Sequence, residues 1–198
     1  MPIIIEKLTP AKVHEALRLY QEVFGAREHT TSKEILRRLE DGRGIFYVAV
    51  DTETSNVIGI KLGYIEGGTC IGRGIAVLPD YRRQGVGTHL LRHFEAEMRA
   101  RGDVHTYVFG SATDEGVPFH IASGYTPTVL IQFTDRQLRE RLDLSNFTIA
   151  REGYNQEYRV YQIYLELEEP QRNLAYLRSL QHTFPEADVQ FVFSKKDL

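Results

Sequence analysis

The sequence predicts an α/β fold in which a mixed central sheet has helices on both faces. Three observations indicate this class. Apolar residues recur at helical spacing early in the chain, β-branched stretches bounded by glycine and proline follow, and residues 70–109 have the pattern of strand, helix and strand. Two strands joined by such a helical crossover run parallel when they share a sheet.

The composition excludes several classes of protein. The chain of 198 residues is 42% hydrophobic and 26% charged, as in ordinary globular proteins. Because no apolar run approaches the roughly 20 residues of a membrane span, we expect no membrane association. The N-terminus has no signal-peptide pattern, and the single cysteine, Cys70, permits no internal disulfide. These features predict a cytoplasmic protein.

The charge pattern does not favour a nucleic-acid partner. The formal net charge is -3, and no basic stripe is present that could follow a phosphate backbone. The densest basic cluster surrounds one loop and one helix, which predicts a small anion site. Its members are Arg73, Arg82, Arg83, Arg92, Arg99 and Arg101.

Helices are expected first along the chain. Thr9 and Pro10 are typical of a helix start, and Gly25 follows the end of that helix. A second helix begins at 31–34, where Thr-Ser-Lys-Glu forms a capping-box pattern, and ends by Gly42.

Strands and helices then alternate through the middle of the chain. Pro79 ends the third expected strand because proline has no N–H to donate to a ladder. Gly102 stands where a helix C-cap belongs. The expected order is strands at 45–50, 57–65 and 69–78, a helix at 85–101, a strand at 104–109, a short helix to 123, and a strand at 128–133.

The last third predicts a smaller α/β unit. A second capping-box pattern at 134–137 predicts a helix to about Leu142, and a helix is expected from Pro170. The remaining strands are expected at 147–152, 158–167 and 189–193, with the hairpin turn at 153–156. Counted from Thr128, the order β-α-β-β-α-β is the split βαβ pattern. We therefore divide the chain into domains 1–133 and 134–198.

Residues 74–88 carry the most informative motif. A strand ends at Pro79, two arginines follow at 82 and 83, and Gly85-Val86-Gly87 enters a helix. A helix N-terminus has unpaired N–H groups and partial positive charge, and guanidinium groups suit phosphate oxygens. The alternative is a simple strand-to-helix turn with solvated arginines. A P-loop is excluded because its lysine is missing, and a dinucleotide fingerprint is excluded because Leu90 replaces its third glycine.

This segment resembles the signature of the GNAT superfamily, Arg/Gln-x-x-Gly-x-Gly/Ala, at Arg82, Gly85 and Gly87. The preceding Val-x-Pro-x-Tyr-Arg, residues 77–82, is similar to that family's fourth strand and loop. Residues 118–125, Pro-Phe-His-Ile-Ala-Ser-Gly-Tyr, are similar to its second conserved segment. The resemblance covers about the first two thirds of the chain.

The resemblance implies an acetyl-CoA-dependent N-acetyltransferase that acts on a primary amine of a small molecule or a peptide. The diphosphate of acetyl-CoA would lie on the loop and helix start, and its pantetheine arm would pair with a fourth strand opened by a bulge. The N–H of Val77 would polarise the thioester oxygen. The implied cofactor-binding residues are Ile75, Ala76, Val77, Arg82, Arg83, Gln84, Gly85, Val86, Gly87, Thr88 and Phe119.

The catalytic residues are less well defined by the resemblance. Where the family often has a tyrosine that protonates the leaving thiolate, this chain has His120; Ser111 or water are the alternatives. No carboxylate lies on the fourth strand, so we assign no general base. Residues that could line the acceptor side are Glu66, Glu28, His29 and Glu157.

Two other functions use the same motifs. A longer acyl-CoA could replace acetyl-CoA, and a non-enzymatic acyl-CoA sensor would explain the missing tyrosine. The seven histidines have no metal-ligand spacing, so no metal is expected. An exposed sheet edge in the C-terminal part would favour a homodimer.

Overall fold

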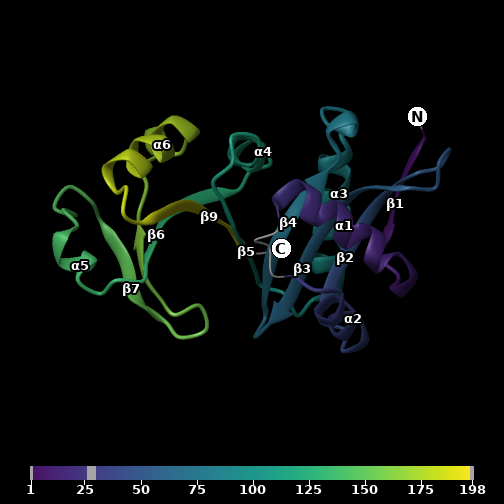
Figure 1. Cartoon of the computed structure of the whole chain (residues 1–198), viewed down its shortest axis with the longest axis horizontal. Helices are drawn as coiled ribbons and strands as arrows, with labels where there is room; N and C mark the ends of the chain where they lie inside the picture. Colours follow the sequence, from purple (N-terminus) through teal and green to yellow (C-terminus); the bar gives the residue numbers. More distant parts are fainter. Residues whose placement is uncertain (1, 26–29, 197–198) are drawn as a thin grey trace. The chain divides into compact units, whose positions relative to one another are not determined.

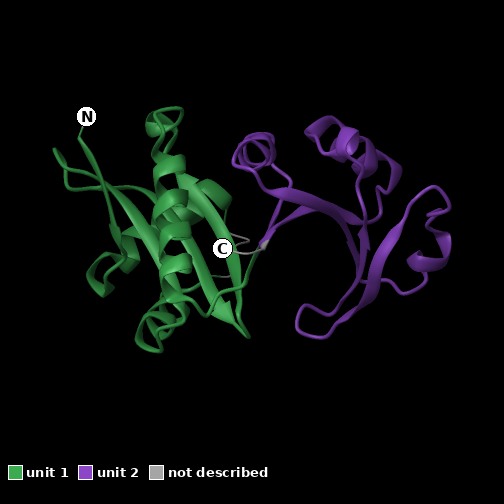
Figure 2. Cartoon of the chain, turned by 180° about the vertical axis from the view of Figure 1, so that it is seen from behind, with its two compact units in different colours: residues 1–107, 196–198 green, residues 108–195 purple. Residues whose placement is uncertain are grey.

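The computed structural model describes residues 2–25 and 30–196. Its contacts divide the chain into two compact units, which Figure 2 shows in different colours. Unit 1 contains the chain up to Tyr107 together with Lys196, and unit 2 contains Val108–Lys195. The domain boundary at 133/134 stays a prediction.

Unit 1 is built from four antiparallel strands in the order β1-β2-β3-β4, followed by the start of β5. Its helices are α1, α2 and α3, and a 3₁₀ turn at Pro10–Lys12 precedes α1. The bounds are β1 Ile3–Lys7, α1 Val13–Phe24, α2 Ser32–Glu40, β2 Gly44–Asp51, β3 Val57–Glu66, β4 Thr69–Val77, α3 Val86–Arg101 and β5 Thr106–Ser111.

Helices cover both faces of the unit 1 sheet. Figure 1 has α1 in front of the strands, and Figure 2, seen from behind, has α3 in front of them. Successive side chains of β3 lie on opposite faces of the sheet, because side chains alternate along a strand. Ile60 and Leu62 belong to the buried cluster that includes Tyr20 of α1, whereas Lys61 lies against Phe94 of α3.

Unit 2 continues β5 and adds four more strands in the order β5-β9-β6-β8-β7. The pairs β6/β9, β6/β8 and β7/β8 are antiparallel. Counted from β6, this is spatial order 4-1-3-2, so the split βαβ prediction is confirmed. The bounds are α4 Gly116–Ala122, β6 Thr126–Phe133, α5 Leu138–Arg141, β7 Ile149–Asn155, β8 Val160–Leu165, α6 Leu174–Thr183 and β9 Asp188–Lys196.

The mixed α/β class is confirmed, with differences in individual elements. Strand β1 was not expected, because five residues are too few for a clear pattern. The second capping box does not form: Asp135 instead accepts a hydrogen bond from the N–H of Gln137 at 2.9 Å, and α5 begins only at Leu138. The hairpin turn also lies later than expected, at 156–159, where Arg159 adopts φ 55°. No helix among the described residues is long and apolar enough to cross a membrane.

Candidate cofactor site and catalytic residues

The loop between β4 and α3 has an unusual backbone. After Val77 a 3₁₀ turn covers Pro79–Tyr81, and Arg82 is extended with φ -70° and ψ 160°. Arg83 then has φ 61° and Gly85 has φ 82°, both in the left-handed region. These two reversals turn the chain so that Gly85 becomes the N-cap and α3 begins at Val86. Glycine suits the N-cap position because it adopts this conformation without strain.

The start of α3 fits an anionic group. The first N–H groups of a helix have no partner within the helix, and the helix dipole places partial positive charge there. The first turn of α3 contains no acidic residue. Arg83, Gln84 and Gly85 are exposed, and a Cβ built at Gly85 would meet no atom within 4 Å. The residues therefore leave open space for a diphosphate beside the amides.

Side chains of the loop hold it against the sheet. Arg82 Nε donates to the carbonyl of Val77 at 3.0 Å, and Gln84 Nε2 donates to the carbonyl of Asp80 at 2.8 Å. The Tyr81 hydroxyl donates to the Asp51 carboxylate of β2 at 2.8 Å. Hydrogen bonds from the Glu53 N–H and from this hydroxyl lower the pKa of Asp51. Part of the Arg82 guanidinium thus positions the loop.

The β4 segment expected to bind the pantetheine arm lies next to a bulge. Ile75, Ala76 and Val77 pair with Lys61, Ile60 and Gly59 of β3. The register then shifts from the pair Leu62–Gly74 to the pair Gly63–Gly72, which leaves Arg73 as the extra residue of β4. A bulge is therefore present in the fourth strand, but it lies at Arg73, before the segment 75–78 in which it was expected. From α1, the Tyr20 hydroxyl donates to the Arg73 carbonyl.

A buried lysine lies at this bulge, and the sequence reasoning missed it. Lys61 is 1% exposed. Its Nζ donates to the carbonyls of Leu62 at 3.2 Å and Gly74 at 3.1 Å, and lies over the rings of Phe94 and Tyr107. Burial lowers the pKa of Lys61 to about 7. The available signal was a charged residue inside the otherwise apolar stretch 57–65.

The predicted basic cluster is divided in the structure. Arg99 and Arg101 lie at the C-terminal end of α3, whose 16 residues extend about 24 Å from its first turn. They pair with Glu95 and Glu97 of the same helix. Only Arg82 and Arg83 therefore belong to the loop at the start of α3.

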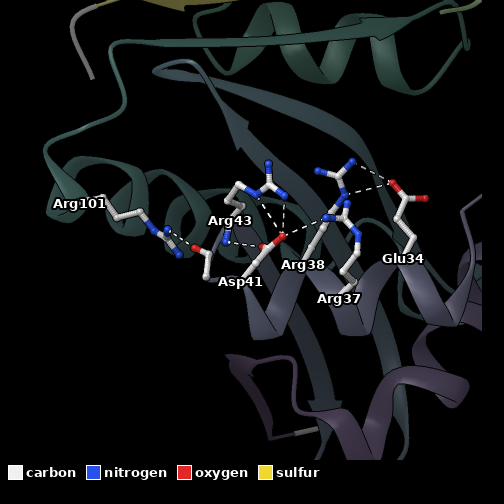
Figure 3. Close-up of polar contacts among 7 residues, drawn as sticks. Glu34, Arg37, Arg38, Asp41, Arg43 and Arg101 are labelled. Atoms are coloured by element: carbon white, nitrogen blue, oxygen red, sulfur yellow. Dashed lines mark hydrogen bonds and ion pairs between the residues drawn. The ribbon is translucent and has the colours of Figure 1, made fainter.

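Arg101 takes part in a second arginine group beside α2 (Figure 3). It donates to the carbonyl of Gly42 at 2.7 Å, while Asp41 accepts from Arg37 and Arg43. This hydrogen bond and the two ion pairs of Asp41 hold the turn between α2 and β2. We interpret the group as structural.

The remaining candidates belong to unit 2. Ser111 ends β5 and is partly exposed. Phe119 and His120 are adjacent on α4, and His120 is 5% exposed. Its ring centroid lies 4.3 Å from that of Phe109 and 5.3 Å from that of Phe193. His120 is thus packed in an aromatic cluster that also includes Phe119 and Tyr125.

The candidates for a general base stay predictions. Glu66 ends β3 and Glu157 lies in the turn after β7, and both are exposed. Glu28 and His29 lie outside the described residues.

Comparison with known protein families gives one match. The model of the acetyltransferase (GNAT) family matches residues 12–120, which is more than half of the 198 residues. The match includes α1, β4, the loop at 82–88 and most of α4. No curated protein sequence matches the chain.

Solved structures of acetyltransferases have a similar fold. The ribosomal-protein-S18-alanine N-acetyltransferase of Escherichia coli is 18% identical with a TM-score of 0.54, and the alignment covers 85% of this chain and 97% of that chain. Ard1 from Thermoplasma volcanium is also 18% identical, with a TM-score of 0.52 and coverage of 85% and 100%. An aminoglycoside acetyltransferase from an uncultured soil metagenomic sample, in complex with sisomicin, is 17% identical, with a TM-score of 0.53 and coverage of 61% and 86%. At these identities the likeness concerns the fold.

Proposed function

Because the chain belongs to the GNAT family of acetyltransferases, we propose that it transfers an acetyl group from acetyl-CoA to a primary amine of a small molecule or a peptide. The observation that carries this proposal is the start of α3. Its first turn contains no acidic residue, and the two left-handed residues before it, Arg83 and Gly85, present backbone to an open surface.

Each part of the cofactor segment has a proposed role. Residues 82–88 hold the diphosphate through the amides of α3 and the guanidinium groups of Arg82 and Arg83. The backbone of Ile75, Ala76 and Val77 holds the pantetheine arm, and Phe119 packs against the cosubstrate. Acetyl-CoA supplies the acetyl group as a thioester. The N–H of Val77 stabilises negative charge that develops on the carbonyl oxygen.

Two residues are proposed to supply a proton to the thiolate that is released. Ser111 is partly exposed at the end of β5, whereas His120 is 5% exposed among aromatic rings. Because a proton donor has to reach its acceptor through one hydrogen bond or one water, Ser111 is the first candidate and His120 the second. Water removes the amine proton in this proposal, since no carboxylate lies on β4.

The acceptor is proposed only as a class. The similar structures are named for acceptors as different as the alanine of a ribosomal protein and an aminoglycoside. The cofactor segment does not distinguish these, because it contacts only acetyl-CoA. A neutral amine of either kind satisfies the proposal.

Calorimetry followed by thiol release tests the proposed function. The full chain is titrated with acetyl-CoA, propionyl-CoA and ADP, and release of free CoA thiol is then measured over a panel of peptide N-termini, polyamines and aminoglycosides. We expect binding of acetyl-CoA and turnover with at least one amine. Preference for propionyl-CoA would show that the transferred acyl group is longer than acetyl. Tight binding of acetyl-CoA without turnover would favour the sensor function. Absence of binding to every thioester would refute the proposal.

The remaining proposals concern location and assembly. We propose a cytoplasmic protein without a nucleic-acid partner, in line with its net charge of -3. A homodimer is proposed through β7, because this terminal strand of unit 2 is exposed from Ile149 to Tyr154. Exposed strand edges pair readily with a second copy. Sedimentation velocity of the full chain and of an Ala150→Pro variant tests this: the variant should remain monomeric.

A further inference from the structure

Lys61 occupies an unfavourable place for a lysine. It lies in the middle of β3, 1% exposed, where an amine has lost its hydration. An apolar residue of similar length would avoid that cost, since buried ionisable groups are expensive unless they are well bonded. Interactions with its neighbours offset this cost. Its hydrogen-bond acceptors include two backbone carbonyls, and it lies over the rings of Phe94 and Tyr107.

The two carbonyls lie at one special point of the sheet. Leu62 and Gly74 are the last residue pair before the register between β3 and β4 shifts. A bulge disrupts the local ladder, and buried carbonyls at such a point need donors. Nζ of Lys61 donates to a carbonyl on each strand, at 3.2 Å and 3.1 Å. The amine therefore ties β3 to β4 where the regular pairing is interrupted.

The other side of the bulge is held just as closely. Gly74 has φ 140°, and a Cβ at this residue would lie 2.7 Å from the hydroxyl oxygen of Tyr20. That hydroxyl donates to the carbonyl of Arg73. Lys61 from the α3 face and Tyr20 from the α1 face thus fix two successive carbonyls of β4. Ile75 to Val77 follow immediately.

We propose that Lys61 is a positioning residue that sets the path of β4 from the bulge into the segment 75–77, and thereby the binding of the pantetheine arm. This inference rests on the proposed function. It assigns Lys61 no contact with the diphosphate, which is held by the loop and the start of α3. Loss of the amine should therefore weaken binding of the pantetheine arm and leave binding of the nucleotide and its phosphates unchanged.

Two ligands separate these halves. Acetyl-CoA contains the arm, whereas 3′-phospho-ADP contains only the nucleotide and its phosphates. Lys61→Met keeps the side-chain length and removes the donor. We expect its dissociation constant for acetyl-CoA to rise about tenfold, while that for 3′-phospho-ADP stays within twofold of the wild type. Ile163→Ala is the control, because Ile163 is buried in β8 of unit 2, outside the unit that contains β3 and β4, and it should leave both constants within twofold.

Gly74→Ala disturbs the bulge from the opposite face and should give the same selective loss. It decides the question if Lys61→Met does not fold. Unchanged acetyl-CoA affinity in the variants that fold, or equal weakening of both ligands, would overturn the inference while leaving the proposed function intact. A wild-type protein that binds neither ligand would instead remove the proposed function and this inference with it.

Discussion

In unit 1, the residues proposed to bind acetyl-CoA run almost continuously from β4 into α3, whereas in unit 2 the surroundings of His120 are assembled from distant segments. Phe109 of β5 and Phe193 of β9 contact the same ring, although most of unit 2 lies between them in the chain. The first region is determined mainly by local turn chemistry. The second depends on long-range strand pairing.

The two regions therefore depend to different degrees on residues that are distant in the chain. The cofactor loop is fixed by nearby contacts, such as Arg82 with Val77 and Gln84 with Asp80. The aromatic cluster around His120 requires β9 to lie between β5 and β6. Changes far along the sequence should therefore disturb the second region first.

Truncation after Phe133 should have the largest effect. It removes β8 and β9, which are both hydrogen-bonded neighbours of β6, and it exposes Phe109. We expect an insoluble product, measured as soluble yield and by circular dichroism. Truncation after Lys196 keeps every strand and serves as the control. A soluble 1–133 fragment with a cooperative melting transition that binds acetyl-CoA would show that unit 1 needs none of these strands.

Ser111→Ala should lower kcat about a hundredfold, in the range typical of a lost proton donor, with little change in acetyl-CoA affinity. Ser123→Ala is the control, because that hydroxyl, at the C-cap of α4, donates to the carbonyl of Phe119. His120→Phe is the competing test. If its kcat falls further than that of Ser111→Ala while affinity is kept, His120 is the donor.

Gly85→Val should raise the dissociation constant for acetyl-CoA at least tenfold. A β-branched residue is strained at φ 82°, so the start of α3 should move while the core of unit 1 stays packed. Gly153→Val on exposed β7 is the matched control, since a Cβ there meets no atom within 4 Å. A fall in melting temperature without weaker binding would contradict the role of Gly85 at the diphosphate.

The smallest predicted effect is a pH dependence of unfolding. The folded pKa of Lys61 is about 7, against 10.5 for an ordinary lysine. Between these values the unfolded chain binds the additional proton, so stability should rise with pH by up to about 1.4 kcal/mol per pH unit. Denaturant titrations between pH 7.5 and 8.5 measure this slope below the ordinary pKa values of Cys70, 9.0, and Tyr47, 10.0, both of which burial raises to about 12. Lys61→Met should lose the slope, and an equal slope in both proteins would refute the assignment.

Much of the fold could be predicted from local patterns. Helices α1 to α3 and strands β2 to β4 follow from apolar periodicity and from terminal residues such as Gly102, which has φ 70° at the end of α3. The split βαβ order followed from the succession of elements. The helix start predicted from the capping-box pattern at 134–137 is wrong, because the Asp135 carboxylate accepts a hydrogen bond from the N–H of Gln137. A sequence pattern does not show which of several local hydrogen bonds will form.

The proposed site divides in the same way. A helix N-terminus and its glycine are local features, so the sequence indicates residues 82–88, and their role in binding stays a prediction. The burial of His120 and the bonds of Lys61 were not predictable, because each depends on strands that meet only in the folded sheet. Lys61 Nζ reaches the carbonyl of Gly74, whose strand partner Leu62 is the last residue of β3 before the register shifts, and alternation along one strand does not reveal such a shift.

The central place of β9 has a consequence for synthesis on the ribosome. Strands β2, β3 and β4 are sequential neighbours and can pair as they emerge. In contrast, β9, which lies between β5 and β6, is translated after all other strands of unit 2. At typical elongation rates, the stretch from residue 111 to residue 188 takes roughly 4 to 15 s. During that interval the nascent chain presents open strand edges, and a chaperone that shields such edges would have its greatest influence then.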